Sequence, residues 1–306
     1  MTTTTGTATA TAAPAGTRPT PSTRSTVEVI DPVHTLEGAG FPVRRPFPVP
    51  ELPFLDPFLM IDQTGPLLLA PGEAKGAPDH PHRGFEAVSY VIEGAMEYAD
   101  SAGHRGVTGP GDVQWLTAGA GIVHSNMPSA ELLERGGRQH LVQIWVNLPA
   151  RLKGLPPHTQ NHGPGTIPTV PTGDGGELTV IAGSTHGVTG PFDTHLPVLL
   201  VHARLAAGGR AEFTVPAHHN AAVYVLSGAA AVPAAALADG RLAVLAQDGE
   251  RIVVTAPGDA AEVLVLAGEP IGEPVARGGP FVMNTVEELR QAQADFAAGR
   301  LGRSTS

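Results

Sequence analysis

Short apolar runs that end in Gly, Pro or Asp constrain the fold more than any other feature of the chain. The runs are Ala87–Ile92, Val113–Leu116, Leu141–Val146, Leu178–Ala182, Val198–Val201, Ala222–Leu226, Ile252–Val254 and Val263–Leu266. Such runs are typical of β-strands, and turn residues between them are typical of tight connections. The chain has 38 Gly, 30 Pro and only 16% charged residues, a composition that disfavours long amphipathic helices. The pattern therefore predicts an all-β sandwich or barrel.

A Pro- and Gly-rich stretch over residues 151–176 divides the chain into two halves and is not expected to be regular throughout. One segment repeats across this stretch, because Glu86–Gly94 aligns with Asn220–Gly228 without a gap. The repeat supports two copies of one barrel. We therefore predict a first β domain over residues 27–150, a linker over 151–176 and a second β domain over 177–302.

The two ends of the chain differ in character. Residues 1–26 are rich in Thr, Ala and Pro, with too few apolar side chains to offset the entropy lost on ordering, and we expect a disordered tail. Near the other end, Thr285 and Glu288 have the spacing of a capping box, and apolar residues then recur on one helical face. Gly299 is a plausible stop signal. This predicts one C-terminal helix packed against a barrel.

Composition excludes several classes of function. The chain has no Cys, which excludes disulfides, thiolate metal ligands and iron–sulfur clusters. A formal net charge of -10 argues against direct nucleic-acid binding, which needs clustered Lys and Arg. No apolar run reaches the length of a membrane span or a secretory signal, so the expected location is the cytoplasm, without membrane association. A monomer is the simplest expectation, since two fused barrels can bury their shared face.

Two histidines separated by one residue are the strongest indication of a chemical function in the sequence. His80 and His82 flank Pro81, and on a strand they would point to the same side. His124 follows some forty residues later, and a third imidazole from a neighbouring strand can complete three corners of a metal site. Histidine pairs also occur in surface loops without any ligand role. If residues 80–90 are one extended strand, Glu86 shares the face of the histidines and is a candidate catalytic carboxylate.

Several longer motifs carry a family resemblance. They are residues 56–58 (DPF), 80–86 (HPHRGFE), 109–115 (GPGDVQW), 121–125 (GIVHS), 143–149 (QIWVNLP), 268–270 (GEP) and 279–284 (GPFVMN). The Gly and His spacing resembles a cupin barrel, and the motifs in this order resemble the pirin family over nearly all residues from about 27 to 302. The resemblance implies a bicupin, with two tandem antiparallel jelly-roll barrels and one iron-type site in the first.

Carried onto this chain, the family's histidine ligands correspond to His80, His82 and His124. The family's fourth ligand, a glutamate, corresponds to Asn126. Asn is a neutral and weaker oxygen donor, so a divalent ion here keeps a charge near +2 and hard ions should bind less tightly. The lower oxidation state should be relatively favoured. We expect one divalent ion, Fe²⁺ first among the transition metals, with no metal in the second barrel.

The resemblance implies two roles that use the same ligands. One is a quercetin 2,3-dioxygenase-like activity on a small aromatic or flavonol-like substrate, with Phe85, Tyr90 and Trp115 lining an apolar cavity. The other is a metal-dependent or redox-sensing regulatory cofactor that binds a protein partner without turnover. Asn126 weakens the first role if the family's glutamate acts as a base. A metal-free scaffold with a decayed site is the third reading.

Overall fold

The computed structural model describes Met1 and residues 22–303, and its first half forms two facing β-sheets. One sheet has the strand order β12-β9-β6-β11-β4-β3-β2, and the other has the order β5-β10-β7-β8. The elements are β2 (Val33–Glu37), β3 (Phe41–Phe47), β4 (Phe58–Leu69), β5 (Ala77–His82), β6 (Phe85–Glu93), β7 (Met96–Asp100), β8 (Arg105–Thr108), β9 (Val113–Thr117), β10 (Ile122–Pro128), α1 (Ala130–Arg135), β11 (Gly137–Asn147), η1 (Ala150–Leu152) and β12 (His158–His162).

The second half repeats this plan, with one sheet in the order β1-β22-β19-β24-β17-β14-β13 and another in the order β18-β23-β20-β21. Its elements are β1 (Thr26–Ile30), β13 (Thr169–Pro171), β14 (Gly176–Ala182), β15 (Ser184–Thr185), β16 (Val188–Thr189), β17 (Val198–Leu205), β18 (Arg210–Thr214), β19 (Asn220–Ser227), β20 (Ala230–Val232), β21 (Ala235–Leu237), β22 (Leu242–Leu245), β23 (Arg251–Thr255) and β24 (Ala261–Gly268). The predicted all-β architecture of two barrels is therefore confirmed, and each of the eight apolar runs lies in a strand.

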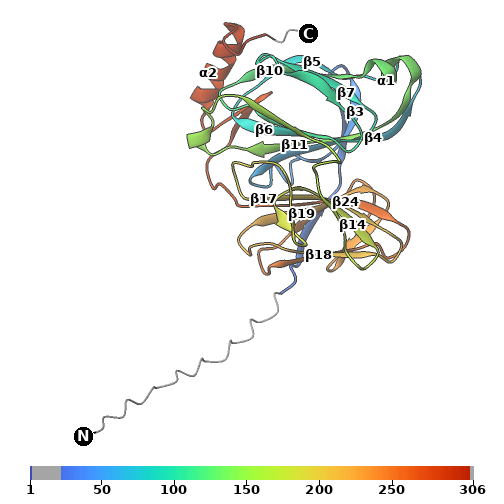
Figure 1. The fold of residues 1–306 in the computed structure, drawn as a ribbon. Helices are drawn as coiled ribbons and strands as arrows, with labels where there is room; N and C mark the ends of the chain where they lie inside the picture. The colour runs from blue at the N-terminus through green and yellow to red at the C-terminus, as the bar shows by residue number, and fades with distance from the viewer. Residues whose placement is uncertain (2–21, 304–306) are drawn as a thin grey trace.

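The repeat predicted from the sequence occupies equivalent central strands of the two large sheets. β6 lies between β9 and β11, and β19 lies between β22 and β24. These two sheets face each other across a shared apolar core that includes Val88, Ile144, Leu200 and Leu264. Figure 1 shows β6 and β11 of the first barrel above β17 and β19 of the second. The barrels are thus joined through the outer faces of their large sheets, which leaves the interior of each barrel separate.

Both ends of the chain cross to the opposite barrel. β1 pairs with β22 of the second barrel. Two residues before β1, the fully buried Arg24 donates hydrogen bonds to backbone carbonyls that include those of His219 and Gly249. The expected tail is therefore ordered from residue 22 onward, while residues 2–21 lie outside the described residues. The expected linker contributes β12 to the first large sheet and β13 to the second, so the exact domain limits stay a prediction.

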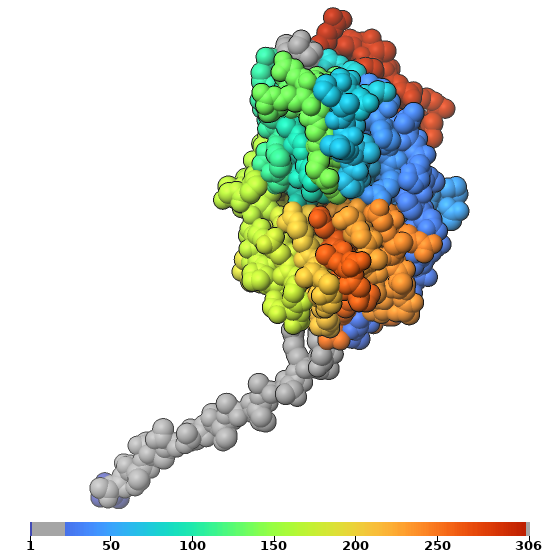
Figure 2. Space-filling model, turned by 90° about the vertical axis from the view of Figure 1, so that its right-hand side faces the viewer, coloured from blue at the N-terminus to red at the C-terminus, as the bar shows by residue number. Residues whose placement is uncertain are grey.

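The C-terminal segment returns to the first barrel through β25 (Ala276–Gly278), β26 (Phe281–Met283) and α2 (Val286–Ala297). Its apolar side chains pack against Val123 of β10. The predicted capping box of Thr285 and Glu288 is present, and Gly299 follows the helix with φ +72°. Figures 1 and 2 show this segment, in red, over the end of the first barrel. Neither helix among the described residues is long and apolar enough to span a bilayer.

A buried acid–base pair links the two barrels and predicts a pH dependence of stability. The fully buried Glu86 accepts hydrogen bonds from Thr117 and from Nδ1 of His195. The hydrogen bond to Glu86 raises the pKa of His195. A raised pKa in the folded state means that the stabilisation is complete below the unfolded pKa of about 6.5 and is lost as the pH rises through the folded value.

We therefore expect thermal unfolding of chelator-treated wild-type protein to shift to lower temperature as the pH rises above about 6.5. The His195→Gln variant should lack this component of the slope, because Gln does not titrate. Circular dichroism melts of both proteins in steps of pH provide the measurement. Parallel pH profiles for the two proteins would contradict the assignment.

Candidate metal centre

Three imidazoles meet inside the first barrel. His80 and His82 lie on β5, and His124 lies directly opposite His80 on the neighbouring β10. One possible ligand atom from each residue lies within 4.8 Å of the others. The Nε2 atoms of His80 and His82 are 3.1 Å apart. Two nitrogen ligands bound to one ion at about 2.0–2.1 Å have a similar separation when they occupy adjacent positions. The structure therefore brings together the three histidines that the sequence nominated.

Backbone carbonyls fix the tautomers of the two β5 histidines. A carbonyl oxygen only accepts, so Nδ1 of His80 donates to the Pro78 carbonyl at 2.7 Å. By the same reasoning Nδ1 of His82 donates to the Pro280 carbonyl at 3.4 Å. In the neutral imidazoles both Nε2 atoms are then unprotonated and face each other with lone pairs. A cation between them removes this repulsion, and carbonyl partners of this kind commonly orient metal-binding histidines.

Burial keeps these imidazoles neutral and therefore able to bind metal. It lowers the pKa of His80 and holds the pKa values of His82 and His124 well below the usual range, with a further lowering from the neighbouring histidines. Nε2 of His124 is buried without a hydrogen-bond partner in the described structure. Buried polar atoms are normally satisfied, so this nitrogen lacks the partner that a metal ion would supply. On these grounds the three residues fit a divalent transition metal.

Asn126 faces the same side of β10 as His124, since residues two apart on a strand share a face. It is half-buried and lines the same cavity as His80 and His82. The pairing of β10 with β5 shifts register between His124 and Asn126, which then lies opposite Ala77. The structure thus places an amide where a carboxylate would have brought negative charge to the site.

Glu86 lies away from the histidines, contrary to the expectation of a shared face. Its carboxylate contacts Thr117 and His195 between the barrels, and its Oε2 atom is buried without a hydrogen-bond partner among the described residues. Tyr90 has the same orientation, and its hydroxyl bonds to His202 of the second barrel. Trp115 packs on Phe192, also between the barrels. A role for Glu86 as a replacement ligand is not supported by this geometry.

The reason is a corner between β5 and β6. His82 ends a strand of the small sheet, whereas Phe85 begins a strand of the large sheet, so strand parity is not continuous through residues 83–84. Gly84 has φ +88°, and a Cβ atom there would lie 2.0 Å from the Val282 carbonyl oxygen. The buried ammonium of Lys153 donates to the carbonyls of both Gly84 and Val282. Only a glycine fits this corner, which resets the face presented by the next strand.

Aromatic residues next to the histidines come from β6 and β11. Phe85 lies 5.0 Å from His82 between ring centres, but it is fully buried and does not line the cavity as expected. Trp145, which the sequence did not nominate, lies 5.2 Å from His82 and stacks on Phe85. Trp145 follows Ile144 on β11 and therefore faces the other side of the sheet. Since Ile144 belongs to the core between the barrels, this alternation could have placed Trp145 inside the first barrel. The barrel interior is thus partly aromatic beside the candidate ligands.

Trp145, His80 and His82 line a cavity of about 880 Å³, within the range of small-molecule sites. Its wall combines β2 to β8, β10 and β11 with residues of the C-terminal segment. Lining residues relevant to chemistry are Arg45, Asp62, Lys75, His80, His82, Asn126, Trp145 and Arg277. The cavity lies within the first barrel, and the returning C-terminal segment completes its wall.

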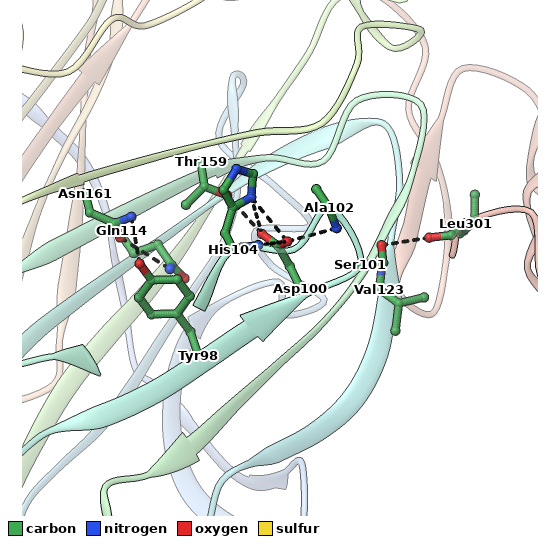
Figure 3. Close-up of polar contacts among 10 residues, drawn as sticks. All are labelled: Tyr98, Asp100, Ser101, Ala102, His104, Gln114, Val123, Thr159, Asn161 and Leu301. Carbon is green, nitrogen blue, oxygen red and sulfur yellow. Dashed lines mark hydrogen bonds and ion pairs between the residues drawn. The ribbon is translucent and has the colours of Figure 1, made fainter. Parts of the chain in front are cut away.

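Asp100 is also close in register to the histidines, because it pairs with His124 across β7 and β10. Its carboxylate, however, accepts from the backbone N–H groups of Ala102 and His104 and from Nδ1 of His104. Thr159 of β12 adds a longer contact of 3.4 Å. Figure 3 shows these contacts around one carboxylate. Asp100 therefore stabilises the β7–β8 turn and is not among the grouped metal-binding candidates.

Comparison with known proteins supports the family resemblance that the sequence motifs indicated. The pirin family model matches residues 40–146, and the pirin C-terminal cupin domain model matches residues 200–302. The chain belongs to the pirin family. A pirin-like protein of Caulobacter vibrioides is 41% identical over 284 residues, which cover 90% of this chain and 99% of the relative. Human pirin is 38% identical over 271 residues, with coverage of 87% and 90%.

Solved structures confirm the bicupin fold of this pirin-family chain. A crystal structure of quercetin 2,3-dioxygenase from Acinetobacter baumannii matches with a TM-score of 0.87 and 35% identity. The match covers 92% of this chain and 99% of that structure. The site of the present chain retains three histidines that could bind a metal ion. It has Asn126 at the position to which the family resemblance assigns a glutamate.

Proposed function

We propose that this protein is a metal-dependent oxygenase that acts on a small aromatic, flavonol-like substrate in the first barrel, with Fe²⁺ as the metal ion. The observation that carries the proposal is that His80 and His82, which lie close to His124, line a cavity of about 880 Å³. The name of the Acinetobacter relative supports the substrate class. Trp145 lines the cavity and supplies aromatic surface for a planar ligand, and Phe85 stacks on it from behind.

The metal would supply Lewis acidity, redox chemistry and open coordination positions. The protein's residues supply orientation: His80 and His82 are held by the carbonyls of Pro78 and Pro280. Buried apolar neighbours such as Met60 and Trp145 restrict water around the site. The side-chain amide of Asn126 does not accept a proton near neutral pH, so it cannot serve as base toward a flavonol hydroxyl.

Oxygen consumption tests this function directly. Untagged full-length protein would be depleted of metal with a chelator, reloaded with Fe²⁺ and mixed with quercetin in an oxygen-electrode cell. We expect oxygen uptake that needs both protein and metal and that parallels loss of the flavonol absorbance. Stoichiometric metal binding without any flavonol-dependent oxygen uptake would reject the oxygenase proposal.

That result would favour the second candidate, a metal-dependent regulatory protein whose output is binding to a protein partner. Asn126 is the observation in its favour. The chain keeps three histidines that could bind a metal ion, but an amide at position 126 offers no proton acceptor to a substrate in the cavity. A partner that binds the metal-loaded protein more tightly than the metal-free protein, without turnover, would support it. If the purified protein binds no metal ion, the remaining interpretation is a metal-free scaffold.

A further inference from the structure

An arginine from the second half of the chain lies at the mouth of the histidine cavity. Arg277 belongs to β25 and lines the cavity together with His80 and His82. Its guanidinium carbon lies 4.9 Å from the centre of the Trp145 ring, in a cation–π contact. The Trp145 ring lies 5.2 Å from the His82 ring. A single aromatic side chain therefore separates this cation from the candidate metal ligands.

The hydrogen-bonding capacity of Arg277 is largely unused. A guanidinium carries five N–H donors, but within the described residues Arg277 has only a 3.4 Å contact to the Leu59 carbonyl and a 3.6 Å contact to Sδ of Met60. It forms no ion pair with a carboxylate of residues 22–303. Arg45 lines the same cavity but is already paired with Asp62 at 2.6 Å. Because the Arg277 side chain is exposed, a ligand entering the cavity can reach its donors.

The part of the cavity beside the histidines would also favour negative charge once a metal ion is bound. The three imidazoles are neutral, and Asn126 contributes no anion. A divalent ion held by them would keep its full positive charge, so an anionic ligand would be favoured there. Of the carboxylates that line the cavity, Glu37 and Asp62 are paired with Arg45, whereas Arg277 forms no ion pair among residues 22–303. Trp145 lies between Arg277 and the candidate metal site. A neutral ligand would leave the donors of Arg277 without a charged partner.

We propose that this cavity selects a planar aromatic anion, with carboxylate or phenolate as its charged group, and that Arg277 recognises that group. The inference rests on the proposed function, since it assigns a substrate class to the same cavity. Arg277 is a specificity-determining residue in this assignment. Its planar donors suit bidentate recognition of a carboxylate, whereas Trp145 holds the guanidinium in place.

Matched probes test the selection. Calorimetric titration would compare 3,4-dihydroxybenzoate with 3,4-dihydroxybenzamide, which differ in charge but have nearly the same shape. For the full chain we expect tighter binding of the carboxylate. Arg277→Gln should raise the dissociation constant of the carboxylate about 5-fold, a value suited to an exposed charge contact, and leave that of the amide unchanged. Arg277→Lys should retain part of the preference, and Arg290→Gln on the surface of α2 should retain all of it.

The titrations would be made on chelator-treated protein and on protein loaded with redox-inactive Zn²⁺. A carboxylate preference that depends on Arg277 in metal-free protein supports this inference even if the oxygenase proposal fails. Equal effects of Arg277→Gln on both probes, or no effect on either, would overturn it. Failure of the carboxylate to bind at millimolar concentration would overturn it as well. Thermal melts of Arg277→Gln should match those of the wild type, because the side chain is exposed.

Discussion

The His124→Ala variant is expected to lose stoichiometric metal binding, with affinity for divalent transition metals reduced more than about 100-fold. Mutation of a residue that only hydrogen-bonds to a metal ligand typically lowers metal affinity by about 10- to 100-fold. His124 is itself a candidate ligand, so its loss should have a larger effect. Its Nε2 atom is buried and lacks another partner among the described residues. Metal analysis after dialysis against a defined Fe²⁺ or Zn²⁺ buffer would measure the loss.

A matched control is His34→Ala, because His34 is exposed on β2 and does not line the cavity. This variant should bind metal like the wild type. Circular dichroism would establish that His124→Ala is folded, since His124 is only 3% exposed and its removal leaves a small void. A folded His124→Ala protein that retains one tightly bound metal ion would refute the assigned site.

The Asn126→Glu variant should gain affinity for a divalent ion by about 10-fold or more. A carboxylate adds negative charge and a stronger oxygen donor, and the charge of the ligands is a principal control of metal affinity. Asn126 lines the cavity on the same strand face as His124, so the new carboxylate would point toward the histidines. Competition titration with a chromogenic chelator would measure the change.

The same variant separates the two functions. If the amide limits proton removal from the substrate, Asn126→Glu should also increase flavonol-dependent oxygen uptake. Asn161→Glu on β12 is the matched control, since it makes the same chemical change at an exposed position outside the cavity. Unchanged metal affinity in Asn126→Glu, beside a folded protein, would show that residue 126 does not reach the metal.

Much of the fold could be predicted because its signals are local. Short apolar runs bounded by turn residues predict strands from nearby residues alone, and the eight predicted runs lie in strands. The gap-free repeat correctly predicted two related barrels, with Tyr90 and Tyr224 at equivalent places between them. Each hydroxyl bonds across the interface, Tyr90 to His202 and Tyr224 to Gln63. The short helix α1 was missed, since its six residues carry little periodic signal.

The candidate site was predictable only in part. His80, His82 and His124 were nominated from their spacing and from the resemblance, and the structure places them together. Glu86 was misplaced because strand parity was extended across a corner that Gly84 forms between two sheets. Trp145 and Arg277 were not nominated, since an isolated Trp or Arg in a sequence carries no sign of the cavity that it lines.

The sequence by itself determined the strands, the two-barrel plan, the three histidines and the neutral residue at position 126. These features depend on residue identity and on neighbours a few positions away. Only the tertiary structure decided that Glu86 faces the second barrel, that Pro280 orients His82 and that Arg277 stands at the cavity mouth. The His82–Pro280 contact spans 198 positions. This contact depends on the packing of the C-terminal segment against the first barrel, which burial of its apolar side chains stabilises.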